Sequence, residues 1–113
     1  MNYYSVNNSN KGSLNLASYV FAQIAKETLE ELAKGDLKDS ISLKLAKNRD
    51  NVSCDIDHNQ VRVDVSFSAI RNSDVQNSVE CIQKEIYEAI YDATEISTVK
   101  VNVAVVSFVD SNL

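Results

Sequence analysis

The sequence is poor in the residues from which most enzyme sites are built, since its 113 residues include one histidine, two cysteines and two glycines. With His58 alone, the chain cannot form a metal site of several histidines or a triad that uses two imidazoles. Gly12 and Gly35 do not precede a Lys-Ser or Lys-Thr pair, so the sequence lacks a glycine-rich phosphate-binding loop. We therefore expect no metal, no cofactor and no nucleotide hydrolysis by that route.

Basic residues and long apolar runs are also scarce. The chain has 11 Lys and Arg against 16 Asp and Glu, a net charge of −5, which disfavours nucleic-acid binding because phosphates attract clustered positive charge. No apolar run approaches the roughly 18 residues of a membrane span. Residues 1–11 lack the basic and apolar segments of a secretory signal. These features predict a cytoplasmic protein that does not insert directly into a membrane.

The few reactive side chains have structural interpretations. Cys54 alternates with Val52 and Ile56 and is expected to face the core, whereas Cys81 lies off the apolar stripe of a helix and is expected to be exposed. Their spacing suggests neither a disulfide framework nor a metal site. His58 lies in "DIDHNQ", a composition that favours a turn with local hydrogen bonds over catalysis. We identify no catalytic residue and predict that the chain is not an enzyme.

Hydrophobic periodicity predicts the order of secondary structure. Residues 1–11, rich in Asn, Ser and Tyr, are expected to form a flexible leader, and residues 12–113 a single domain. A period of two predicts strands, and spacings of three and four predict helices, in the order strand 12–17, helix 19–34, strands 41–45, 52–56 and 61–69, helix 74–94 and strand 98–109. This β-α-β-β-β-α-β order is typical of a two-layer α+β fold, with two helices packed on one face of a mixed β-sheet.

Polar residues indicate where these elements start and stop. Ser18 is expected to cap the first helix with its hydroxyl, and Gly35 to end that helix in the left-handed conformation. Ser73 and Gln76 are expected to form a capping box at the second helix. The tetrapeptide "DHNQ" predicts a hairpin turn between strands 52–56 and 61–69.

The final strand, "TVKVNVAVVSFV", begins as a strict alternation and ends apolar on both faces. Its valines at 99, 101, 103 and 105 are expected to face the helices, so the alternation places Ala104, Val106 and Phe108 on the opposite, otherwise polar face. A contiguous apolar patch with a polar rim is typical of a self-association or partner site. The alternative is that the leader or a loop folds across these three residues.

Two tyrosines extend the list of interface candidates. Tyr87 and Tyr91 stand one turn apart, beside the apolar stripe of the second helix, where they could line a groove for a partner. In the alternative interpretation, each ring buries an edge and leaves its hydroxyl in water. The candidate interface is therefore formed by Ala104, Val106, Phe108, Tyr87 and Tyr91.

Three stretches share spacings with a known family: "GSLNLASYVFAQIA", "IQKEIYEAIYDAT" and "VNVAV", the last beginning seven residues after Thr94. Together they resemble the alkaline shock protein family, small bacterial proteins associated with envelope stress. The first is similar to that family's Gly-x-Ile-x-Ile opening and the helix after it. Gln83, Thr94 and Val101 fall in the family's register, and Glu95 stands where the family usually has Gly. The resemblance extends from Gly12 to about Val109.

The resemblance implies a non-enzymatic cytosolic protein of the envelope or alkaline stress response that acts through protein–protein contacts. Some members of that family are held near the membrane by a membrane-inserted partner bearing a similar domain, so we expect a protein partner, either a membrane-anchored relative or a second copy in a homo-oligomer. An alternative from a different class is a small ligand-binding or regulatory subunit that modulates an enzyme. Membrane fractionation with and without a partner discriminates between these two hypotheses.

Overall fold

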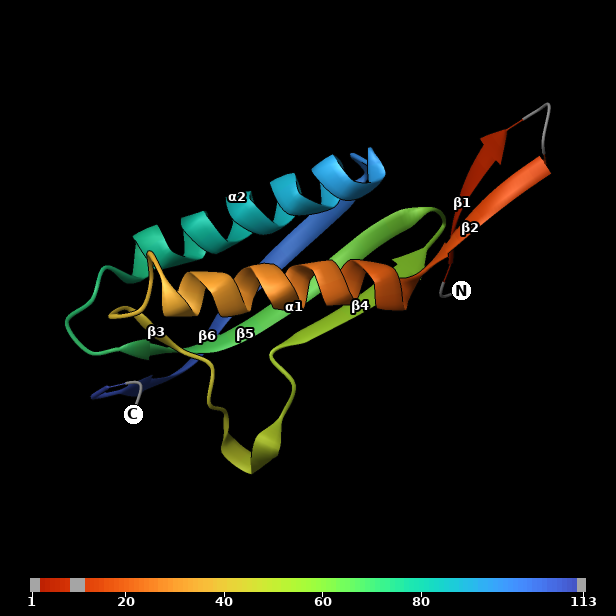
Figure 1. The fold of residues 1–113 in the computed structure, drawn as a ribbon. Helices are drawn as coiled ribbons and strands as arrows, with labels where there is room; N and C mark the ends of the chain where they lie inside the picture. Colours follow the sequence, from red (N-terminus) through yellow and green to blue (C-terminus); the bar gives the residue numbers. More distant parts are fainter. Residues whose placement is uncertain (1–2, 9–11, 112–113) are drawn as a thin grey trace.

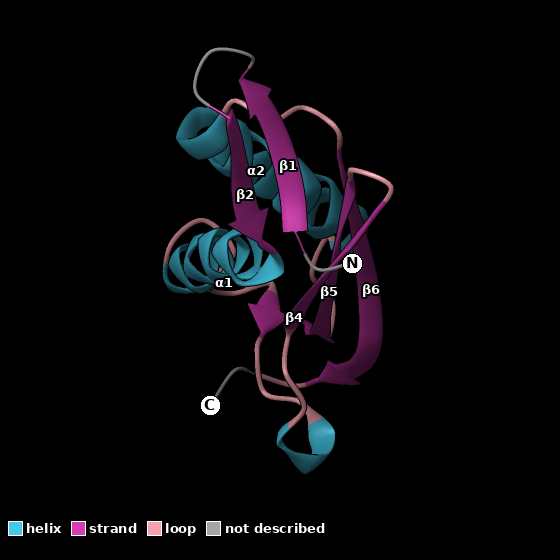
Figure 2. Cartoon of the chain, turned by 90° about the vertical axis from the view of Figure 1, so that its right-hand side faces the viewer, coloured by secondary structure: helices cyan, strands magenta, loops and turns pink. Residues whose placement is uncertain are grey.

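The computed structural model describes residues 3–8 and 12–111 and has the two-layer α+β architecture that the sequence predicts (Figure 1). In chain order its elements are β1 (Tyr3–Asn8), β2 (Gly12–Ala17), α1 (Ser18–Lys34), β3 (Ile41–Ser42), the short 3-10 helix η1 (Ala46–Asn48), β4 (Val52–Asp57), β5 (Gln60–Ile70), α2 (Val75–Thr94) and β6 (Val99–Val109). Both helices lie on one side of strands β4, β5 and β6 (Figure 2). Neither helix has a window apolar enough to cross a membrane, within the residues described.

The main sheet is mixed and is organised around β5. β4 pairs with β5 in antiparallel register, from Val52 opposite Val65 to Asp57 opposite Gln60, and β3 extends the same arrangement opposite Ser68 and Ala69. β6 runs parallel to β5 along nearly its whole length. Because a strand has two edges, β6 occupies one edge of β5, and β3 and β4 share the other.

The hairpin of β1 and β2 projects away from the main sheet and lengthens the molecule to 54 × 26 × 18 Å (Figure 1). At its base, the side-chain amide of Asn59 accepts from the backbone N–H of Ser5 and donates to the carbonyl of the same residue, both at 3.0 Å. Tyr4 donates to or accepts from Thr98 at 3.0 Å, and its ring meets Phe21 edge-on. Within the predicted leader, Tyr3–Asn8 form a strand, while residues 1–2 and 9–11 lie outside the described residues.

The predicted hairpin turn is present, whereas the helix caps differ from the predicted ones. His58 and Asn59 have φ values of 50° and 55°, the left-handed pair that a two-residue hairpin turn requires, so the turn prediction is confirmed. At α1, Ser18 is the first helical residue and provides no cap, and Gly35 has a φ of −116° rather than a positive one. At α2, the cap is Asp74, whose carboxylate accepts from Asn77 N–H at 3.0 Å.

The predicted capping box does not form, because the side chains of Ser73 and Gln76 make other hydrogen bonds. Ser73 donates to the carbonyl of Ile70 at 2.6 Å, and Gln76 donates to Glu80 one turn along the helix. Ser73 therefore stabilises the connection from β5 to α2 rather than the first turn of the helix.

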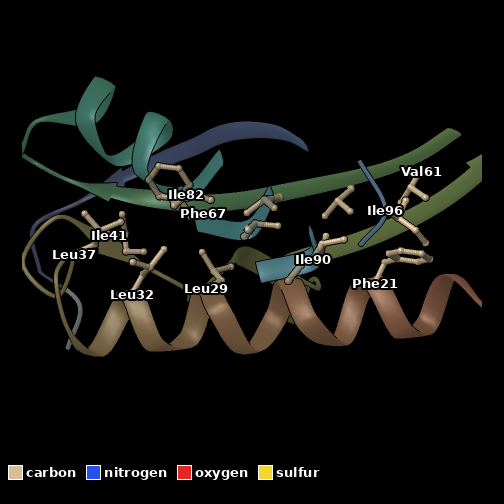
Figure 3. Close-up of a cluster of buried hydrophobic side chains, with 14 of the residues drawn as sticks. Phe21, Leu29, Leu32, Leu37, Ile41, Val61, Phe67, Ile82, Ile90 and Ile96 are labelled. Carbon is tan, nitrogen blue, oxygen red and sulfur yellow. The ribbon is translucent and has the colours of Figure 1, made fainter. Parts of the chain in front are cut away.

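The core lies between the helices and the sheet, as Figure 3 shows for Phe21, Leu29 and Leu32 pointing from α1 towards the strands. α2 contributes the three isoleucines of its predicted apolar stripe, Ile82, Ile86 and Ile90, which are fully buried. For α1, spacings of three and four predict a buried face of Val20, Ile24, Ala25, Thr28 and Leu32. Ala25 and Leu32 are buried as predicted, but Phe21 and Leu29 are buried as well, and Val20, Ile24 and Thr28 are only half-buried. β5 contributes every second residue to this core, namely Val61, Val63, Val65, Phe67 and Ala69.

The other face of the sheet is polar, as its alternation predicts. Arg62 on β5 lies 3.7 Å from Asp55 on β4 and 3.3 Å from Asp64 on its own strand. Asn102 on β6 donates to Asp64 at 3.0 Å. A polar network thus crosses all three long strands on the face away from the helices. Because these groups are partly exposed, each pair is worth at most about 1 kcal/mol.

Candidate functional site

The histidine and the acidic residues do not converge on a catalytic arrangement. His58 lies at the tip of the β4–β5 turn with its side chain 92% exposed, and its Nδ1 is 3.0 Å from Asp57 Oδ1. Within residues 3–8 and 12–111, no group of three or more His, Cys, Asp or Glu side chains could hold a metal ion. The positive φ of His58 gives the residue a structural role, because a two-residue hairpin turn requires this conformation.

Both cysteines are free thiols that pack against the edge of the core. Burial, together with the carboxylates of Asp55 and Asp64, raises the pKa of Cys54 from 9.0 to about 11. Burial also raises the pKa of Cys81, so neither thiol is activated as a nucleophile. The expectation that Cys81 is exposed was wrong in degree, since its side chain is half-buried.

A groove of about 350 Å³ separates α1 from the segment that joins β3 to β4. Tyr19, which is 71% exposed, lines one end of it. The charged side chains that line the groove have both signs, with Lys26 and Glu30 on α1 and Arg49 and Asp50 on the opposite segment. The lining therefore selects neither an anionic nor a cationic ligand.

The most distinctive surface of the molecule is the outer edge of β6, which we call the β6 edge and define by residues 99–108. In the described part of the chain, β6 pairs with β5 alone. The N–H of Val61 donates to the carbonyl of Thr98 at 3.0 Å, and in a parallel ladder the backbone groups of successive residues point to alternate sides. Lys100, Asn102 and Ala104 therefore bond towards β5. The N–H and C=O groups of the intervening valines point outward, away from the sheet.

α2 covers this edge incompletely. The side chain of Gln83 donates to the outward carbonyl of Val101 at 3.3 Å, and the hydroxyl of Tyr87 donates to the carbonyl of Ser97 at 3.2 Å. Gln83 and Tyr87, together with Glu80, Lys84 and Val101, line an open depression beside the strand. The valines at 99, 101, 103 and 105, which face the helices, remain only half-buried. Apolar surface and outward backbone groups thus occur together along one edge.

The two edges of the sheet differ in their protection against strand pairing. Soluble proteins commonly place charged residues on exposed edge strands, which discourages another chain from adding to the sheet. β4, at one edge, is six residues long and carries Asp55 and Asp57. β6, at the other edge, is eleven residues long, and Lys100 is its single charged residue. The β6 edge is therefore the more favourable place for a further strand.

A β-bulge changes the direction of the last residues of β6. Phe67 is opposite Val105, but Ser68 is opposite Ser107, so Val106 is an extra residue in the strand. The hydroxyls of Ser68 and Ser107 lie 2.6 Å apart, which places Ser107 on the polar face. The next residue, Phe108, is opposite the buried Ala69 and thus belongs to the helix-covered face. Strict alternation predicts Phe108 on the polar face, and the bulge moves it to the helix-covered face.

The five predicted interface residues are distributed over both ends of the β6 edge. Val106 and Phe108 are 44% and 55% exposed near the end of the strand, and Tyr91 is 46% exposed near its start. Tyr87 is half-buried beside Ser97, and Ala104 is exposed on the polar face. Ser97 and Phe108 are 11 residues apart, which is about 36 Å along an extended strand. These five residues do not form one patch within a single chain.

The backbone of the β6 edge could not be identified from the amino-acid pattern. The outward N–H and C=O groups of β6 have no side-chain signature, because they depend on which strand lies at the edge. A signal for the bulge is present, since the adjacent Val105 and Val106 interrupt the alternation before Ser107. No protein-family model, no curated protein and no solved structure matches this chain, so the resemblance to the alkaline shock protein family stays a prediction.

Proposed function

We propose that this chain is a non-enzymatic protein-interaction domain whose binding surface is the β6 edge. The observation that carries the proposal is a strand of eleven residues with outward backbone groups and half-buried valines at the side of the sheet. An extended segment that adds to such an edge gains main-chain hydrogen bonds, and its alternate side chains provide specificity. The net charge of −5 disfavours nucleic acid as the partner.

The proposal includes a role of the envelope or alkaline stress type, in which the cytosolic chain is recruited to the membrane by a membrane-anchored partner. Two observations support the resemblance behind it. Gln83 and Val101, which both fall in the family's register, are joined by a hydrogen bond on the β6 edge. Glu95, at the position where that family usually has Gly, has a φ of 61°, a conformation that glycine adopts at little cost.

The alternative function, a small ligand-binding regulatory subunit, would use the groove beside Tyr19. This placement separates the two hypotheses in space, because Tyr19 lies in the first turn of α1 and Phe108 near the end of β6. Tyr19 and Phe108 are both exposed aromatic residues, at 71% and 55%, and therefore offer a matched pair of substitutions.

The test is affinity capture with crosslinking in the native cell, followed by membrane fractionation. We expect Phe108→Asp to lose the captured protein while its circular dichroism spectrum is unchanged, and Tyr19→Asp to retain it. The wild-type chain should fractionate with membranes when the partner is present and stay soluble when the partner is deleted. Loss of binding by Tyr19→Asp alone, with a uniformly soluble pool bound to one metabolite, would support the regulatory alternative.

A further inference from the structure

We infer that the β6 edge binds a second copy of this chain, with the two β6 strands antiparallel about a two-fold axis at Asn102. This inference rests on the proposed function, because it names the partner of the same surface. It is carried by three features of β6: the symmetry of its sequence, the direction of its backbone groups and the position of Phe108 after the bulge.

The regular part of β6 before the bulge is nearly symmetric about Asn102. In "VKVNVAV", residues 99–105, valines stand at equal distances on either side of the centre. Antiparallel pairing about Asn102 would bring Val101 opposite Val103 of the second copy, and Val99 opposite Val105. Lys100 would lie opposite Ala104, so the single charged residue of the strand never meets itself. A two-fold interface requires this kind of self-complementarity.

The backbone groups agree with the same register. The outward N–H and C=O groups belong to the odd-numbered residues between 99 and 105, and pairing about Asn102 places odd residues opposite odd residues. The apolar faces then match as well, since these valines all face the helices of their own chain. A shift by one residue would oppose outward groups to inward ones and apolar side chains to polar ones. The depression beside the strand also carries both charge signs, in Glu80 and Lys84, which suits contact between identical copies.

The bulge connects the two separated halves of the predicted interface. Because Val106 is an extra residue in the strand, pairing about Asn102 places Phe108 of the second copy at the level of Ser97, the residue bound by Tyr87. Phe108 lies on the helix-covered face because of the bulge, and Tyr87 and Tyr91 lie on α2, on that same side. Phe108 of each copy would therefore pack near the tyrosines of the other. Without the bulge, Phe108 would lie on the opposite face of the sheet.

Disulfide crosslinking tests the register directly. Residues whose backbone groups face β5 would form non-hydrogen-bonded pairs across the two-fold axis, with Cα atoms about 4.5 Å apart, inside the range that a disulfide spans. In a chain with Cys54→Val and Cys81→Ala, we expect Asn102→Cys to crosslink to itself under mild oxidation. Ser53→Cys is the control, because Ser53 is exposed on β4 at the other edge of the sheet.

Light scattering provides the second measurement. We expect the wild-type chain to have twice its monomer mass of 12.5 kDa, Phe108→Asp to return to the monomer mass with an unchanged circular dichroism spectrum, and Tyr19→Asp to keep the doubled mass. A wild-type chain that stays monomeric, or a dimer in which Asn102→Cys crosslinks no faster than Ser53→Cys, would overturn the inference. If Phe108→Asp unfolds, the crosslinking result decides. A monomeric wild type whose Phe108→Asp variant still loses a different protein would leave the proposed function standing and remove the second copy as its partner.

Discussion

Truncation of Ile86 measures how much the contact between α2 and the sheet contributes to stability. Ile86 lies in the middle of α2 and is fully buried. The substitution Ile86→Ala removes Cγ1, Cγ2 and Cδ1, which at about 0.8 kcal/mol per buried carbon corresponds to about 2.4 kcal/mol of lost burial. The cavity left behind adds to this, so we expect a total cost of about 2–5 kcal/mol. That is a large part of the roughly 5–15 kcal/mol by which a domain is stable.

Urea unfolding followed by circular dichroism measures this cost, with all variants at the same chain concentration because self-association would add to stability. For a slope of about 1–3 kcal/mol per molar urea, a loss near 3 kcal/mol lowers the midpoint by about 1–3 M. Glu88→Ala is the matched control, since Glu88 is exposed on the same helix and alanine is a good helix former. Equal midpoint shifts for the two variants would refute the assigned face of α2.

Three further results are expected from local contacts. Folding raises the pKa of Cys54 to about 11, so its protonated thiol stabilises the fold fully below pH 9 and loses this contribution as the pH rises from 9 towards 11. The Cys54→Val variant should therefore be less sensitive to alkaline unfolding in that window. Equal sensitivity of the two chains would contradict this cause. In native-state thiol labelling followed by peptide mass spectrometry, Cys81 should react before Cys54, and the reverse order would show that burial and charge do not control these thiols. Asn59→Gly should keep the left-handed turn but remove both hydrogen bonds to Ser5, so the β1 amides should exchange their hydrogens with solvent faster while the α2 amides are unaffected. Unchanged hydrogen exchange in β1 would mean that other contacts hold the hairpin.

The elements that the sequence predicted well are those with strong local signals. β5 has a strict period of two, α2 has isoleucines at spacings of four, and both positions agree with the structure within a residue or two. The hairpin turn at His58 and Asn59 was also predictable, because short polar residues adopt the left-handed conformation that such turns need. In each case, residues close in sequence determine the outcome.

The buried face of α1 was harder to predict because its sequence offers two adjacent apolar faces. Val20, Ile24 and Thr28 lie on one side of the predicted face and Phe21 and Leu29 on the other, while Ala25 and Leu32 are buried as predicted. Which side is buried depends on where the sheet lies relative to the helix, a relation that the sequence of α1 does not contain. β1 presents the same difficulty, since it is held by Asn59, more than fifty residues away in the chain.

The candidate site divides in the same way between sequence and tertiary structure. The sequence by itself determined that β6 is a long strand with one charge, valines on alternate positions and apolar residues on both faces near its end. Only the tertiary structure decided that β6 is an edge strand, because strand order depends on long-range pairing with β5. It also decided the side on which Phe108 lies, because the bulge at Val106 follows from the pairing of Ser68 with Ser107 across two strands. Periodicity describes a strand in isolation, whereas an edge and a bulge exist only relative to a neighbouring strand.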